Sequence, residues 1–166
     1  MAQSQRDKAQ RHLGDDLQPD EQVRQAVLAY RIGGARQDIA AGVGALILGP
    51  GGRVLGAAVS PSTPGAADAP ELPMPHRCFI VLTTHRLLIL SLGGFFIAEP
   101  KDIVHAVPLD RIAWMTEPAI DGNLAGALRV TVGLTSGALL RWEFPHLQIN
   151  RGRVLINELR QHVPNS

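Results

Sequence analysis

The sequence predicts a mainly β protein of the α+β class, in which one curled or capped antiparallel sheet carries a C-terminal helix. Three stretches indicate this. Residues 78–92 form two apolar runs, rich in β-forming residues, around a short polar centre. Residues 128–144 alternate apolar and polar side chains in two runs, which is typical of half-buried strands. Residues 151–163 carry an apolar stripe at helical spacing and must lie on another layer.

Length and composition indicate a globular chain with a real core. The 166 residues suit one domain of ordinary size, expected over 21–163. Sixteen basic residues stand against fifteen acidic ones, so no overall field favours nucleic acid. One cysteine cannot form an internal disulfide, and no run of eighteen apolar residues occurs. A cytoplasmic protein is expected, with peripheral attachment at the inner face of the membrane left open.

The N-terminal stretch, 1–20, is hydrophilic, has no apolar leader-like run, and carries only a thin apolar stripe interrupted by a glycine. It predicts a flexible segment or a frayed helix rather than a core element. A short helical turn capped by Asp20 is then expected to lead into a first strand at about 26–32.

A Gly/Pro-rich insertion occupies about 39–75. Its first part, 39–60, is strongly apolar, but glycines and a proline divide it into arms too short to span a bilayer. One interpretation is a structural loop that covers an end of the sheet. The other is a loop that contacts a membrane or a partner. The second part, 61–75, holds five prolines and is expected to be a mobile connection. In the second interpretation of the apolar part, the contacts are Leu46, Ile47, Leu48 and Arg53.

The stretch 78–92 is the predicted centre of the sheet. Phe79 and Val81 would share one face, and Ile80 and Leu82 the other, so the first strand is apolar on both sides. A strand of this kind is usually covered on both faces. The polar residues Thr83 to Arg86 would form the turn.

The segment 103–115 predicts a strand with a bend. Val107 and Leu109 share one parity, whereas Ile112 and Trp114 share a face of the opposite parity. A bulge or bend is therefore expected near Asp110 and Arg111, where a local ion pair is the default.

The run 128–144 predicts the cleanest hairpin. Matching the inward residues across it pairs Leu134 with Leu140 and Val132 with Trp142. This leaves a three-residue loop, 136–138, in which Gly137 is free to adopt a positive φ.

The closing helix is expected over 151–163, with Asn150 as its N-cap. Leu155, Leu159 and Val163 recur every fourth residue and form the buried stripe.

Residues that could carry chemistry are few. Cys78 alternates with apolar neighbours and predicts a buried core thiol; the alternative is an enzyme with a dispersed site near Cys78 and His85. His85 and Arg86 at the hairpin turn could contact an anion, although a solvated turn is the default. No Cys-x-x-Cys pair, nucleophile elbow or Walker-type loop occurs, so no metal, cofactor or catalysis is expected.

The order of these elements, from about residue 21 to 163, resembles bacterial PH-like domains of the GRAM-related kind. In that family the first hairpin commonly reads Leu-Thr-Asn-x-Arg and the next strand carries Pro-Leu-x-x-Ile. Thr84 stands here where asparagine is common. The matching residues are Leu82, Thr83, Arg86, Pro108, Leu109 and Ile112.

The resemblance implies a strongly bent antiparallel sheet, a partly open PH-like barrel capped by the C-terminal helix. It also implies binding rather than catalysis, with a protein partner or a lipid surface as the ligand. The arginines near the first strands are scattered rather than clustered, which argues against specific phosphoinositide recognition. The alternatives are an oligomerising structural protein, such as a homo-oligomer, and the enzyme with a dispersed site.

Overall fold

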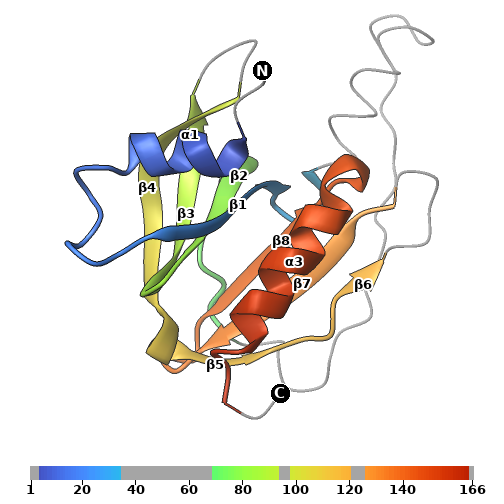
Figure 1. Ribbon diagram of the computed structural model, residues 1–166. Coiled ribbons are helices and arrows are strands. Elements are labelled where there is room, and N and C mark those ends of the chain that lie inside the picture. The colour runs from blue at the N-terminus through green and yellow to red at the C-terminus, as the bar shows by residue number, and fades with distance from the viewer. Residues whose placement is uncertain (1–3, 35–68, 94–97, 121–125, 165–166) are drawn as a thin grey trace, which may run out of the picture.

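The structure, a computed structural model, describes residues 4–34, 69–93, 98–120 and 126–164 (Figure 1). Eight strands form one antiparallel sheet in the order β4-β3-β2-β1-β8-β7-β5, with β6 beside β7. The elements are α1 (Gln5–His12), β1 (Val23–Tyr30), β2 (Arg77–Thr83), β3 (Arg86–Gly93), β4 (Glu99–Pro108), the 3₁₀ turn η1 (Leu109–Arg111), β5 (Ile112–Met115), β6 (Ala119–Ile120), β7 (Leu128–Leu134), β8 (Leu139–Phe144), the 3₁₀ turn η2 (His146–Gln148) and α3 (Ile149–Arg160).

The sheet bends strongly and does not close. Figure 1 shows β2, β3 and β4 on one side and β7 and β8 on the other, with α3 lying across the second group. β1 and β8 join the two groups through the single residue pair Tyr30 and Glu143. The fold class expected from the sequence, mainly β with a bent antiparallel sheet and a capping C-terminal helix, is confirmed by this strand order.

Two hydrophobic clusters lie on opposite faces of β2 and β3. Ile80 and Ile89 belong to the larger cluster, which the stripe of α3 completes. Phe79 and Leu88 belong to the smaller cluster, together with residues of α1. The predicted hairpin, its two faces and their double cover are therefore confirmed.

The helix α1 corrects the expectation of a flexible segment or frayed helix in the part of 1–20 that the structure describes. Ala9 and Leu13 are fully buried in the smaller cluster. Ser4 caps the helix by accepting a hydrogen bond from the Asp7 N–H at 3.2 Å. A thin apolar stripe is enough to hold the helix in place, because it packs on the apolar face of β2 and β3 that carries Phe79 and Leu88.

The first strand begins at Val23, three residues earlier than expected, and a turn in which the Glu21 N–H donates to the Gln18 carbonyl at 2.9 Å precedes it. Val23 is fully buried, and the pairing with β2 shifts between Val23 and Gln25. Such a bulge masks the alternation on which a strand start is recognised in sequence. Asp20 is exposed and caps no helix.

The bend expected near Asp110 and Arg111 is confirmed as η1, between β4 and β5. The shared face of Ile112 and Trp114 is wrong: Ile112 is buried, whereas Trp114 is 43% exposed. The pairing of β5 with β7 shifts between these two residues, so the bulge reverses the direction of the Trp114 side chain.

The β7–β8 hairpin keeps its predicted faces but shifts its register by two residues. Val132 pairs with Leu140, and Val130 with Trp142. A shift of two preserves the alternation, so the inward residues remain inward. The three-residue loop lies one position earlier, and Gly137 has φ of 86°, as its place in such a loop requires.

The closing helix α3 begins at Ile149, after η2, so Asn150 lies inside it rather than at its N-cap. Its predicted stripe is confirmed, because Leu155 and Leu159 are fully buried and Val163 is 7% exposed. Gly152 brings the helix onto β8: a methyl group there would lie 2.5 Å from Cδ2 of Phe144.

The insertion falls mostly outside the described residues, and so do its expected contacts, Leu46, Ile47, Leu48 and Arg53. Its described end is more regular than a mobile connection. Glu71 forms a parallel bridge with Leu139, and Leu72 N–H donates to the carbonyl of Leu139 at 2.9 Å.

Candidate functional site

A buried carboxylate lies beneath the β2–β3 turn. Glu21 is 5% exposed and accepts hydrogen bonds from the Thr83 hydroxyl at 2.6 Å and from Nε and Nη2 of Arg86 at 2.9 and 3.0 Å. The Gln18 N–H donates to it at 3.0 Å. Arg86 also donates to the carbonyl of Asp16 at 2.7 Å. The cluster therefore fastens the N-terminal segment to the hairpin.

The pKa of Glu21 reports this arrangement. Burial alone would raise the pKa, but the hydrogen bonds from Arg86, the Gln18 N–H and Thr83 together outweigh it and lower the pKa from 4.5 to about 2. An external anion would have to displace this carboxylate from Arg86. The Arg86 guanidinium is therefore engaged within the fold by Glu21 and is a poor anion site.

His85, the other expected anion contact, lies on the same turn. Its Nδ1 is 3.2 Å from the side-chain oxygen of Gln18, and its Nε2 is 3.7 Å from the Asp20 carboxylate. The structure thus joins His85 and Arg86 to the N-terminal segment. The sequence patterns did not reveal the role of Glu21; an acidic residue two positions before the start of β1 was the only local signal.

Cys78 lies at the other end of β2 from His85 and is fully buried. Burial raises the pKa of its thiol to about 12, so the thiolate that a nucleophile requires is scarce at neutral pH. The predicted core thiol is confirmed. The alternative of an enzyme site near Cys78 and His85 is not supported, because the two residues are held apart by the length of the strand.

The junction of β1 and β2 marks where the insertion departs. Tyr30 pairs with Arg77, and the Arg31 N–H donates to the carbonyl of His76 at 3.1 Å. The Arg77 guanidinium carbon lies 5.7 Å from the centroid of the Tyr30 ring, within the range of a cation–π contact. Two arginines therefore stand at the base of the connection.

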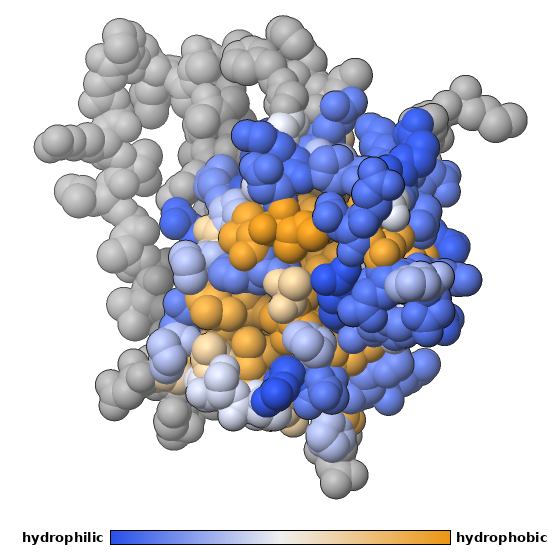
Figure 2. Space-filling view, turned by 90° about the vertical axis from the view of Figure 1, so that its left-hand side faces the viewer, coloured by the Kyte–Doolittle hydropathy of each residue, from blue (hydrophilic) through white to orange (hydrophobic). Residues whose placement is uncertain are grey.

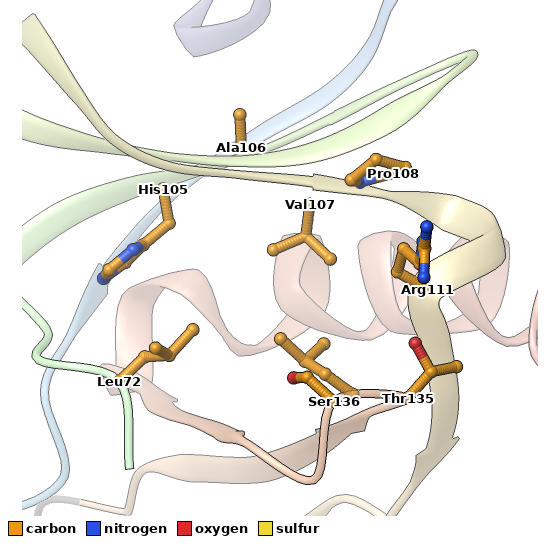
Figure 3. Close-up of a pocket in the computed structure, with 9 residues that line it drawn as sticks. Leu72, His105, Ala106, Val107, Pro108, Arg111, Thr135 and Ser136 are labelled. Atoms are coloured by element: carbon orange, nitrogen blue, oxygen red, sulfur yellow. The ribbon is translucent and has the colours of Figure 1, made fainter. Parts of the chain in front are cut away.

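A pocket of about 360 Å³ lies between the free edge of β4 and the β7–β8 turn (Figure 3). Val107 and Leu134 both line it, and the Val107 side chain points into it from β4. Leu72 and His105 line one end, and Arg111 and Thr135 line the other. The pocket is mainly apolar, with one cation at its rim. No local sequence pattern could have revealed it, since its residues come from four separate segments.

Within the described ranges, no three histidine, cysteine, aspartate or glutamate side chains are grouped so as to hold a metal ion. No helix in the same ranges has the length and apolar character needed to cross a membrane.

The described residues form a bent antiparallel sheet capped by a helix, with a surface pocket at the edge of β4 and a buried thiol in the core. No protein-family model and no curated protein matches the chain. The chain is similar to a solved pleckstrin homology domain from Shewanella amazonensis, with 12% identity and a TM-score of 0.45 over 89% of this chain and 92% of that one. Membership of the GRAM-related kind stays a prediction.

Proposed function

We propose that the protein is a non-enzymatic interaction module that binds a membrane surface or a protein partner through the connection between β1 and β2. The observation that carries the proposal is the place of this connection. Tyr30 and Arg77 lie opposite each other at the ends of adjacent antiparallel strands, so a few residues would join them. The chain instead runs from Arg31 to His76, and connections of such length are usually either functional loops or linkers. The apolar residues within this connection favour a functional loop.

The chemistry of the connection suits a membrane surface. Leu46, Ile47 and Leu48 would enter the interface, and Arg53 would meet an anionic headgroup. One cation near such a surface contributes only about 1 kcal/mol, so apolar insertion dominates and binding is weak and reversible. Under this proposal the protein acts in the cytoplasm, peripherally at the inner face of the membrane.

A protein partner is the second candidate because the formal net charge is only +1, which provides little general attraction to an anionic bilayer. The same apolar residues would suit the apolar centre of a protein interface.

Liposome co-sedimentation tests the membrane version. We expect the wild type to bind vesicles of phosphatidylglycerol and phosphatidylcholine, and the variant with Leu46, Ile47 and Leu48 changed to serine to bind much less. Binding should change only slightly with salt, since charge contributes little.

A matched control removes apolar residues elsewhere. Leu147→Ser with Val154→Ser changes side chains that are 89% and 48% exposed near and on α3, and should leave vesicle binding intact. Absence of wild-type binding would exclude the membrane version and leave the protein partner. Unfolding of the triple variant would show that the three residues belong to the core.

A further inference from the structure

The free edge of β4 offers unpaired backbone groups beside the pocket. The Leu109 N–H donates to the carbonyl of His85 on the β3 side at 3.1 Å. Residues two apart on a strand share this orientation, so Val107 and His105 also direct their backbone groups toward β3. The N–H and C=O of Ala106 therefore point to the opposite side, where no other described strand pairs with β4.

The regular part of this edge is short. Pairing with β3 shifts twice, between Ile89 and Leu90 and between Leu90 and Leu92. Pro100 and Pro108 lack an N–H, and Lys101 and Asp102 are exposed charges. Bulges, prolines and charges are the usual protection of a sheet edge against a long strand of a second copy. Only the stretch around Ala106, along the pocket, remains open to a short segment.

The surface beside this edge is apolar. Figure 2 views the side of the molecule on which β4 lies and shows apolar surface bordered by hydrophilic residues. On β4, Val104 is 38% exposed and Ala106 is exposed. The adjoining pocket volume is near the lower limit of small-ligand sites, which suits one aliphatic side chain rather than a large cofactor.

The pocket rim carries a positive charge that is exposed and could bind an anion. Arg111 is exposed and forms no ion pair among the described residues, and neither does the neighbouring Asp110. Glu71 lies 3.8 Å from Arg141, and Nε2 of His105 is bonded to the carbonyl of Pro73 at 2.7 Å. The Thr135 N–H donates to the Arg111 carbonyl at 2.9 Å, which holds the two residues next to each other at this end of the pocket (Figure 3). The rim therefore suits a carboxylate.

We propose that the pocket binds the C-terminal end of a partner peptide. The extended peptide pairs with Ala106 at the edge of β4, its last side chain, which is aliphatic, enters between Val107 and Leu134, and its terminal carboxylate bonds to Arg111 and Thr135. Backbone pairing supplies affinity, and the pocket and cation supply selectivity for the chain end. The pocket includes Leu72, near the end of the β1–β2 connection, but none of the residues that carry the proposed function, Leu46, Ile47, Leu48 and Arg53. The two proposals can therefore be tested independently.

Fluorescence anisotropy tests the site with a panel of labelled hexapeptides of β-forming residues that end in Val, Leu, Ile, Ala or Phe. Each peptide is used as the free acid and as the C-terminal amide. We expect the Val, Leu and Ile acids to bind, and their amides to bind about tenfold more weakly, because a charge-assisted hydrogen bond is lost.

Arg111→Met should weaken the binding of the acid peptides by about the same factor, since only the carboxylate contacts the guanidinium. The binding of the amides should not change. Arg151→Met is the matched control, because Arg151 is another exposed arginine, on α3. This variant should bind the acid peptides with the affinity of the wild type. Thr135→Val provides a second variant at the rim, with a smaller loss, should Arg111→Met fail to fold.

Several outcomes would overturn the proposal: no saturable binding of any acid peptide at millimolar concentration, equal binding of acid and amide, or wild-type affinity in both rim variants. Displacement of the peptide by octanoate at equal affinity would assign the pocket to free fatty acids instead. Dimerisation in light scattering that prevents binding of every acid peptide would assign the β4 edge to a second copy.

Discussion

A single buried carboxylate fastens the N-terminal segment to the first hairpin. Glu21 is held by Arg86, Thr83 and the Gln18 N–H, and its pKa of about 2 lies below the 4.5 of a free glutamate. A depressed pKa means that ionised Glu21 stabilises the folded state by up to about 3 kcal/mol. This contribution is fully present above the unfolded pKa and is lost as the pH falls from about 4.5 to about 2.

Glu21→Gln should therefore lower the free energy of unfolding by about 2–3 kcal/mol at pH 7, since Arg86 loses its buried partner. The difference from the wild type should shrink steadily between pH 4.5 and pH 2, because the wild type then loses the same contribution. Urea unfolding at several pH values measures both effects.

Glu99→Gln serves as the control at an exposed glutamate of β4, and its difference from the wild type should stay small at every pH. A Glu21→Gln difference that stays constant down to pH 2 would contradict the depressed pKa. It would indicate instead a loss of shape complementarity.

At the scale of the element, α3 packs closely on β8 because Gly152 has no side chain at the point of contact. Gly152 is buried over Phe144, and Phe144 is fully buried beneath it. A methyl group placed 2.5 Å from Cδ2 of an immobile ring cannot be accommodated without a shift of the helix. Helix propensity therefore favours alanine at position 152, whereas the close packing against Phe144 favours glycine.

Gly152→Ala should destabilise the protein, although alanine is the better helix former. The gain in propensity is about 1 kcal/mol, whereas overpacking of a tight core costs about 1–3 kcal/mol. Thermal or urea unfolding should show a net loss of up to about 2 kcal/mol, given these opposing magnitudes.

The double variant Gly152→Ala with Phe144→Leu should lose less than the sum of the two single changes, since the smaller side chain admits the methyl group. Asn157→Ala, on the exposed side of the same helix, should be neutral or slightly stabilising. A stabilised Gly152→Ala variant would show that the helix is free to move away from β8.

At the scale of the whole molecule, two cores share one pair of strands. The larger cluster lies under α3 and the smaller under α1, and β2 and β3 contribute alternate side chains to both. Loss of either cover exposes the same strands on one face. Unfolding should therefore involve both clusters in one transition.

Leu13→Asp should be about as damaging as Leu159→Asp, because each places an unpaired carboxylate at a fully buried position. The cost is several kcal/mol, comparable with the whole stability of a domain of this size. Circular dichroism during urea unfolding should show a large fall of the midpoint for both variants.

Leu147→Asp changes a leucine that is 89% exposed and should leave the midpoint nearly unchanged. An unchanged midpoint for Leu13→Asp would show that α1 contributes nothing to the core. A separate early transition for that variant would show that the two clusters unfold independently.

The sequence by itself determined what depends on local periodicity. The alternation of Phe79, Ile80 and Val81 predicts a strand with two apolar faces, and the spacing of Leu155 and Leu159 predicts the stripe of α3. The turn at Gly137 and the bend at η1 follow from changes in that periodicity. These features are encoded within a few residues, so no distant partner is needed to infer them.

Only the tertiary structure decided what depends on distant partners. Alternation predicts which residues of a hairpin point inward, but it cannot distinguish two registers that differ by two residues. The predicted pairing of Val132 with Trp142 was therefore wrong, and Val132 pairs with Leu140. The thin apolar stripe of α1 is part of the core only because it packs against an apolar face of β2 and β3. Glu21 is buried because Arg86 meets it, and the pocket exists only where the edge of β4 comes near the β7–β8 turn.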